Sequence, residues 1–267
     1  MIESTGKDRE QGMRGKSVAS SCPSPRLLQA ALNGTRTRAE HPQIPLSPEQ
    51  LAMEASAAAA AGAGAIHVHV RDAGGFETLA PDDVSRTLDA IRAACPGTPV
   101  GISSGAWIIP DMRRRLALID GWSVLPDFVS VNLHEAGAAW VIRLLLDKGI
   151  GVEAGIWNAP AARTLVETGL ASDCLRILIE PAEGSCRAYG NLEQIEASLD
   201  SVDRPRLLHG LGPCAWEFVE LAAKRCYDTR VGFEDTLTLP DGTRANSNAD
   251  LVAAARRIVL AATSAAL

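Results

Sequence analysis

The sequence has few aromatic residues and lacks the features that mark membrane and secreted proteins. Only 4% of its 267 residues are aromatic, and five are histidines. No apolar run approaches the roughly 20 residues of a membrane span. The first residues contain no apolar segment of the kind found in signal peptides. We therefore expect a protein that neither spans a membrane nor carries a secretion signal.

Closely spaced cysteines are also lacking. The six cysteines stand at positions 22, 95, 174, 186, 214 and 226, and no pair has C-x-x-C spacing. A disulfide framework or a zinc-finger site needs regularly spaced cysteines. This pattern predicts reduced thiols and a cytoplasmic protein.

An excess of positive charge is missing as well. The chain has 26 Lys and Arg against 32 Asp and Glu, which gives a net charge of −6. Nucleic-acid binding needs clustered basic residues, so a general nucleic-acid binder is excluded. No phosphate-binding loop of the G-x-x-x-x-G-K-[ST] type is present, and no G-x-G-x-x-G follows an early apolar run.

What the sequence does contain is an alternation of short apolar runs with alanine-rich or amphipathic segments. Residues 1–25, rich in Ser, Gly and charge, are predicted to be a flexible leader, and residues 26–267 a single domain. The predicted strands cover 26–33, 64–70, 98–103, 127–133, 149–155, 174–180, 205–211 and 229–235. The predicted helices cover 47–62, 81–95, 111–120, 137–148, 159–168, 191–199, 213–227 and 247–263.

Eight strands, each followed by a helix, predict an α/β fold of the (β/α)8 TIM barrel type. No linker or repeat divides this region. A doubly wound parallel sheet is the alternative, but the first strand lacks the glycine signature of a dinucleotide site.

Two of the five histidines stand one residue apart in the apolar stretch AIHVHV. Alternate side chains of a strand point to opposite faces, so His67 and His69 project to the same side. In a barrel, polar groups at the C-terminal ends of strands form the active site. Glu234 and Asp235 stand at the end of the eighth predicted strand, and in a closed barrel only the first strand separates the eighth from the second. A carboxylate from the eighth strand can therefore meet both imidazoles. Two imidazoles and one carboxylate are a ligand set typical of a catalytic divalent metal, most often zinc.

Other polar residues also stand at or near strand ends: Ser103, Ser104, Asn132, His134, Glu153, Glu180, His209, Arg230 and Asp235. Each feature has a structural alternative. The two histidines can be hydrogen-bonded inside a polar layer of the barrel, Arg230 can be an ion-pair partner of Glu234 or Asp235, and Ser103 can be a turn residue.

The sequence resembles the β-keto acid cleavage enzymes, the family that includes 3-keto-5-aminohexanoate cleavage enzyme. The resemblance runs through AALNGTRTRAEHPQIPLSPEQ, GAGAIHVHVRD, GISSG, SVNL, RVGFEDTLTLPDG and SNADLV. Its specific part is the H-x-H pair combined with the R-x-G-x-E-D box.

The resemblance implies a zinc-dependent barrel enzyme that converts a β-keto acid and acetyl-CoA into acetoacetate and a new acyl-CoA. It matches His67, His69 and Glu234 to the metal ligands. Arg230, Asp235, Ser103 and Glu153 match the catalytic residues, and Ser104 and Asn132 are expected to contact substrate. A homo-oligomer, such as a tetramer, is also implied.

Two positions depart from the family pattern. The stretch NGTRT places Arg36 near a site where relatives have an acidic residue, which predicts a substrate with a neutral or anionic tail bound by Arg36. The stretch GVEAGIW has Gly155 where relatives have a second glutamate. A degenerate metal-binding barrel without turnover, and a metal-dependent aldolase or hydrolase that does not use acetyl-CoA, remain as alternatives.

Overall fold

The computed structural model describes residues 26–181 and 186–264, in which eight parallel strands form a closed barrel. The predicted leader, residues 1–25, lies outside the described residues. The strands are β1 (Leu28–Ala31), β2 (Ala65–Val68), β3 (Val100–Ser103), β4 (Phe128–Asn132), β5 (Gly151–Ile156), β6 (Arg176–Ile179), β7 (Arg206–Leu208) and β8 (Asp228–Val231). Each strand pairs with its neighbours in chain order, and β8 closes the barrel on β1. The predicted (β/α)8 fold is confirmed.

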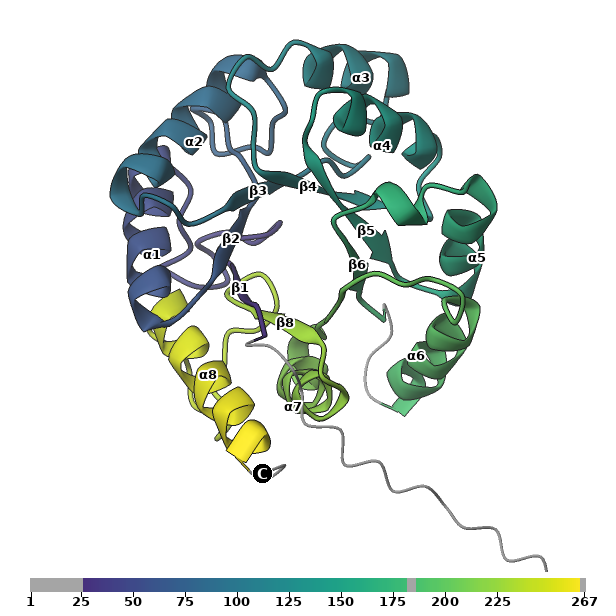
Figure 1. The fold of residues 1–267 in the computed structure, drawn as a ribbon. Helices are drawn as coiled ribbons and strands as arrows, with labels where there is room; N and C mark the ends of the chain where they lie inside the picture. Colours follow the sequence, from purple (N-terminus) through teal and green to yellow (C-terminus); the bar gives the residue numbers. More distant parts are fainter. Residues whose placement is uncertain (1–25, 182–185, 265–267) are drawn as a thin grey trace, which may run out of the picture.

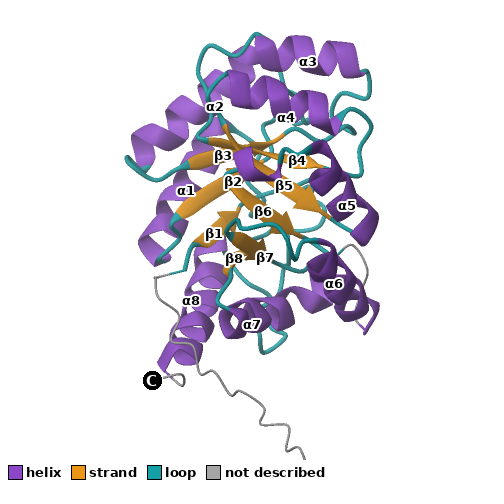
Figure 2. Cartoon of the chain, turned by 45° about the vertical axis from the view of Figure 1, so that its right-hand side comes forward, coloured by secondary structure: helices purple, strands orange, loops and turns teal. Residues whose placement is uncertain are grey.

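The helices surround the barrel, as Figures 1 and 2 show. They are α1 (Pro48–Ala61), α2 (Pro81–Ala94), α3 (Met112–Asp120), α4 (Ala138–Asp147), α5 (Ala159–Thr168), α6 (Cys186–Ser198), α7 (Ala215–Arg225) and α8 (Asn248–Ser264). Two short 3-10 turns, η1 (Ala171–Asp173) and η2 (Gly212–Cys214), lie before β6 and α7. None of the described helices is both long and apolar enough to cross a membrane.

Local sequence explains where the first helix begins and ends. Ser47 caps α1, and Gln50 completes a reciprocal capping box with it. Pro48 stands at the first helical position, where its missing N–H costs nothing. Gly62 ends the helix in the left-handed conformation, with φ of 117°.

The main core lies between the outer face of the barrel and the helices. Ile66 and Val68 of β2 are fully buried in it, while the side chain between them, His67, faces the inside of the barrel. The period-two alternation of each strand thus divides an apolar outer layer from a polar interior.

Most element boundaries differ by a few residues from those predicted. Strands β7 and β8 end at Leu208 and Val231 rather than at residues 211 and 235, so Glu234 and Asp235 follow β8. Strand β2 ends at Val68, so His69 lies just beyond it. The reason is Asn33, whose side-chain amide exchanges two hydrogen bonds of 2.8 Å with the backbone of His69 and replaces a neighbouring strand there. Helix α6 begins at Cys186 rather than at residue 191, and α7 begins after η2 rather than at residue 213.

The cysteines agree only partly with the predicted reduced thiols. Cys95 and Cys174 are free and buried. Burial raises the pKa of the Cys174 thiol to about 11, which keeps it protonated and unreactive. Cys226 is disulfide-bonded, so the prediction is wrong at that position.

Candidate active site

His67, His69 and Glu234 meet at the C-terminal mouth of the barrel, as predicted. Their ligand atoms all lie within 4.8 Å of one another. His67 Nε2 is 3.6 Å from Glu234 Oε2, and His69 Nε2 is 3.5 Å from Glu234 Oε1. Strand β1 lies between β2 and β8 and pairs with both, which is why the two histidines come together with Glu234 although they are far apart in the chain.

The turn after β8 brings Glu234 over the barrel mouth. Gly232 lies so close to β1 that a Cβ atom there would overlap the backbone of Ala31. The amide of Glu234 donates to the Ala31 carbonyl over 3.2 Å, and the amide of Asp235 donates to the Gly232 carbonyl over 2.9 Å. The glycine of the R-x-G-x-E-D box therefore lets the chain turn tightly against β1 and present two successive carboxylates.

The geometry of this cluster fits a divalent metal ion. Zinc binds nitrogen and oxygen ligands at about 2.0–2.2 Å, which separates tetrahedral ligand atoms by about 3.3–3.6 Å. The two imidazoles approach different oxygens of Glu234 at 3.5 and 3.6 Å, and one donor atom from each residue lies within 4.8 Å of the others, so small side-chain shifts suffice to close around an ion. Burial lowers the pKa of His67 to about 3, so its imidazole is neutral and able to ligate. The buried Oε2 atom of Glu234 has no hydrogen-bond partner, as expected for an oxygen whose partner is a bound cation.

A second carboxylate, Glu77, holds the ring of His69. His69 Nδ1 lies 2.5 Å from Glu77 Oε1, and the indole N–H of Trp107 donates to both oxygens of Glu77 over 3.2 Å. Burial opposes charge on His69, but the carboxylates of Glu234 and Glu77 outweigh it and raise the pKa to about 9. Such carboxylate–histidine pairs orient metal-binding imidazoles, and a bound metal takes the place of the proton on the ligating nitrogen.

Arg230 connects Glu234 of this cluster to another carboxylate, that of Asp235. Its guanidinium donates to Glu234 Oε1 over 2.9 Å and to Asp235 over 2.8 and 3.3 Å. Burial opposes charge on Asp235, but Arg230 and His209 outweigh it and hold the pKa of this carboxyl below its usual range. His209 Nδ1 is 3.3 Å from Asp235 Oδ1, and His209 Nε2 is 3.2 Å from Glu180 Oε2.

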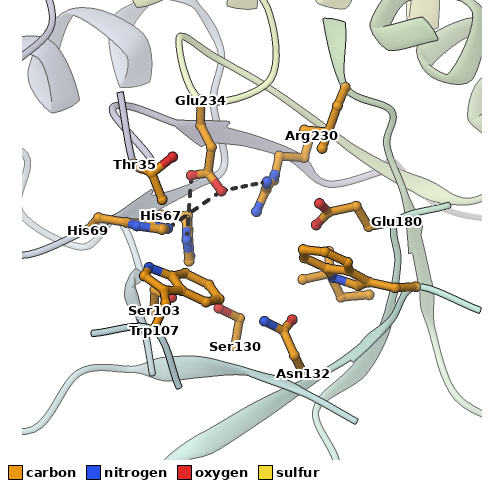
Figure 3. A pocket seen from close by; sticks show the side chains of 13 residues that line it. Thr35, His67, His69, Ser103, Trp107, Ser130, Asn132, Glu180, Arg230 and Glu234 are labelled. Atoms are coloured by element: carbon orange, nitrogen blue, oxygen red, sulfur yellow. Dashed lines mark hydrogen bonds and ion pairs between the residues drawn. The ribbon is translucent and has the colours of Figure 1, made fainter. Parts of the chain in front are cut away.

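These groups surround a cavity of about 160 Å³. Figure 3 shows the metal-ligand cluster on one side of it, with Glu180 and Asn132 across from the two histidines. The lining residues are Thr35, His67, His69, Ser103, Trp107, Ser130, Asn132, Trp157, Leu178, Glu180, Leu211, Arg230 and Glu234.

Six of the ten predicted site residues line this cavity, and four do not. His67, His69, Glu234, Arg230, Ser103 and Asn132 are lining residues. Asp235 is completely buried behind Arg230, and the Ser104 hydroxyl donates to the Ser130 carbonyl over 2.8 Å. Arg36 and Glu153 have other partners.

Arg36 lies at the edge of the site rather than in the cavity. Its Nη1 atom forms an ion pair of 2.8 Å with Glu40, and its Nε atom donates to the backbone carbonyl of Glu234 over 3.2 Å. In this position Arg36 holds the backbone of Glu234. Its predicted contact with a substrate tail remains untested.

Glu153 is enclosed in the barrel interior. Its Oε1 atom accepts a hydrogen bond of 2.7 Å from Gln29 and lies 3.3 Å from the Nε atom of Arg176. Burial raises the pKa of this carboxyl. Gly155 stands where relatives have a second glutamate. A Cβ atom at this position would lie 2.7 Å from Asn132 Oδ1, so Asn132 fills the space that a side chain would need.

Replacement of Glu153 with Ala is expected to destabilise the barrel. The change leaves the Arg176 guanidinium and the Gln29 amide without their main interior partner, and removal of one member of a buried pair costs about 3–5 kcal/mol. Urea unfolding of parent and variant measures the difference. A loss below about 1 kcal/mol would show that the ion pair contributes little to stability.

Sequence reasoning missed several lining residues and one supporting residue. Thr35, Ser130, Leu178 and Leu211 carry no chemical signature of a site, and Trp107 and Trp157 stand in loops after β3 and β5. Glu77 lies eight residues after His69 in a loop, where nothing in the sequence indicates a contact. The sequence places Glu180 and His209 at strand ends, but the position of His209 between Glu180 and Asp235 depends on side-chain geometry.

Comparison with known proteins places this site in a family. A family model described as beta-keto acid cleavage enzyme matches residues 25–265. Among solved structures, the chain is similar to ObcA in its apo form, with a TM-score of 0.63 and 17% identity, covering 82% of this chain and 62% of that one. A binary complex of ObcA with oxaloacetate gives a TM-score of 0.63 and 18% identity, covering 82% and 64%.

The chain thus spans less than two thirds of the length of these ObcA chains. The 3-dehydroquinate dehydratase from Aquifex aeolicus VF5 is similar with a TM-score of 0.54 and 12% identity, covering 86% of this chain and 98% of the other. At these identities the structural likenesses show a shared barrel fold. The family model spans nearly the whole described chain, and on that ground the protein belongs to the beta-keto acid cleavage enzyme family.

Proposed function

We propose that this protein transfers the acyl group of a β-keto acid to coenzyme A, consuming acetyl-CoA and releasing acetoacetate and a new acyl-CoA. The observation that carries the proposal is the shared carboxylate of Glu234. It completes a candidate metal-ligand cluster with two histidines. It also accepts a hydrogen bond from Arg230, which in turn binds Asp235. A candidate Lewis-acid site and a cationic group that can stabilise developing negative charge thus lie side by side in one cavity.

Atom balance defines what the site has to do. In acetoacetate, the acetyl group is bonded to the CH2–carboxylate fragment of the β-keto acid. Carbon 2 of the substrate must therefore lose a proton and attack the thioester carbonyl of acetyl-CoA. The C–S bond of acetyl-CoA breaks and releases the thiolate of coenzyme A, which then attacks the original keto carbon. The bond from carbon 2 to that carbon breaks, so the acyl group leaves as the new thioester and carbon 2 is protonated again. No further organic cofactor is required.

The residues present suit these steps. A divalent metal such as zinc, held by His67, His69 and Glu234, would polarise the keto and carboxylate oxygens of the substrate. Ser103 and Asn132 line the cavity and offer polar groups to the substrate carboxylate. Arg230 stabilises negative charge that develops on the enolate and at the thioester oxygen.

The cavity favours a small substrate with a neutral tail. A cavity of about 150 Å³ holds a molecule the size of benzene, so about 160 Å³ suits a short β-keto acid. Leu178, Leu211 and Trp157 provide apolar walls, and Glu180 lies among them, where an anionic tail would meet a like charge. Coenzyme A has to extend beyond this space.

A screen of β-keto acids with acetyl-CoA, on protein of known metal content, tests the proposal. We expect acetoacetate and a new acyl-CoA in equal amounts, with the highest kcat/KM for short, neutral substrates. Cleavage without acetyl-CoA would instead indicate an aldolase or hydrolase. Fully metal-loaded protein that turns over none of the substrates would favour a barrel that binds metal without catalysis.

The substitution Arg36→Glu distinguishes two roles for Arg36. Because Arg36 contacts Glu40 and the Glu234 carbonyl, the variant places two acids side by side and frees the backbone of a metal ligand. We expect kcat/KM to fall for anionic, neutral and cationic β-keto acids alike. Steady-state kinetics on the three classes provides the measurement. A reversed ranking in favour of cationic substrates would instead support a direct contact with the substrate tail.

A further inference from the structure

The side chain that accepts the proton from carbon 2 has to reach the cavity. A general base must lie within hydrogen-bond distance of the proton that it removes. Of the described residues that line the cavity, only Glu234 and Glu180 carry carboxylates. Glu234 belongs to the candidate metal-ligand cluster and accepts a hydrogen bond from Arg230. Glu180 is therefore the carboxylate that remains to accept the proton from carbon 2.

Asp235 does not reach the substrate in this structure. Its side chain has no exposed surface, and Arg230 covers it with two hydrogen bonds. A path from the substrate to Asp235 through Arg230 would require a guanidinium to give up a proton. Arginine stays protonated in proteins, and the adjacent carboxylates stabilise that charge further.

His209 connects the buried carboxylate to the cavity by a different path. It is completely buried, with one ring nitrogen 3.3 Å from Asp235 and the other 3.2 Å from Glu180. Glu180 comes directly after β6, and its carboxylate turns toward the cavity beside Arg230 (Figure 3). The three side chains form a carboxylate–imidazole–carboxylate chain with Glu180 at the open end.

We propose that Glu180 is the general base of the proposed reaction and that His209, anchored by Asp235, positions it. The C–H bond at carbon 2 breaks, its electron pair stays on the substrate as an enolate, and the proton forms an O–H bond with Glu180. After the carbon–carbon bond to the original keto carbon breaks, Glu180 returns the proton to acetoacetate. This inference rests on the proposed function.

Exchange of the carbon-2 hydrogens with D2O isolates this step. The parent and variants, of measured metal content, are incubated with a β-keto acid alone in D2O, and the methylene signal is followed by NMR against an enzyme-free sample. We expect Glu180→Gln to slow the catalysed exchange and kcat by about 10²–10⁴-fold. Glu180→Asp should retain an intermediate rate, and Glu220→Gln, an exposed change on α7, should match the parent.

The variant His209→Asn tests the positioning role of His209 in the same exchange experiment. It should slow exchange by at least about tenfold, and the double variant with Glu180→Gln should be no more than about threefold slower than Glu180→Gln alone, because residues of one chain act as a unit. Metal content and urea unfolding should stay at parent values in Glu180→Gln. A merely structural Glu180 would alter unfolding and leave the catalysed exchange rate in place.

The outcomes separate this inference from the proposed function. Exchange by Glu180→Gln within about threefold of the parent would overturn the inference, whether or not the parent uses acetyl-CoA. A parent that exchanges carbon-2 hydrogens but makes no acyl-CoA would overturn the proposed function, while loss of exchange in Glu180→Gln would still support the inference. A metal-loaded parent that neither exchanges nor turns over would overturn both.

Discussion

Replacement of His67, His69 or Glu234 with Ala is expected to remove bound metal and abolish turnover while the barrel stays folded. Each change deletes one of three ligands, and two ligands cannot hold the ion at the same affinity. The three side chains lie at the mouth of the barrel, outside the apolar core of strands and helices. Removal of the metal by a chelator should have the same effect on the parent, and added zinc should restore activity only to the parent.

Elemental analysis and urea unfolding of the purified variants provide the measurement. Glu77→Gln serves as a graded companion, since loss of a carboxylate that orients a ligating histidine lowers metal affinity by about 10–100-fold. His134→Ala, which changes a histidine outside the cluster, should keep the metal content of the parent. Stoichiometric zinc in His67→Ala would refute the assignment of the cluster.

Asp235→Asn is expected to reduce turnover by about 10²–10⁴-fold with unchanged metal content. The amide keeps the shape of the side chain but removes the negative charge that binds Arg230 and His209. Without that charge, His209 loses the anchor that directs its other nitrogen to Glu180, and Arg230 has only Glu234 as an ionic partner.

Comparison of kcat, KM and bound metal in parent and variant separates these effects. Because Asp235 does not line the cavity, KM for the β-keto acid should change less than kcat. Near-normal turnover would reduce Asp235 to a structural partner of Arg230. A parallel loss of metal would show instead that Asp235 acts through the neighbouring ligand Glu234.

The sequence by itself determined the fold and the candidate metal-ligand cluster. Eight apolar runs alternating with amphipathic segments specify a barrel, because the hydrophobic period differs between strand and helix. His67 and His69 share one side because a strand alternates its side chains, and β8 lies near β2 because a closed barrel leaves only β1 between them. A carboxylate from the end of β8 could therefore be predicted beside these histidines without coordinates, and the family resemblance pointed to Glu234.

Only the tertiary structure decided which charged groups face the substrate. The direction of a long side chain depends on partners that are distant in sequence, and a strand pattern does not specify them. Arg36, predicted to contact the substrate tail, extends to Glu40 at the edge of the site, and Asp235 is hidden behind Arg230. Glu180 reaches the cavity from β6 with His209 behind it, since the ends of adjacent strands meet in space. The spacing of His67 and His69 predicted the candidate metal site because the strand backbone fixes the direction of both side chains. The role proposed for Glu180 depends instead on how buried charged groups pair across the barrel.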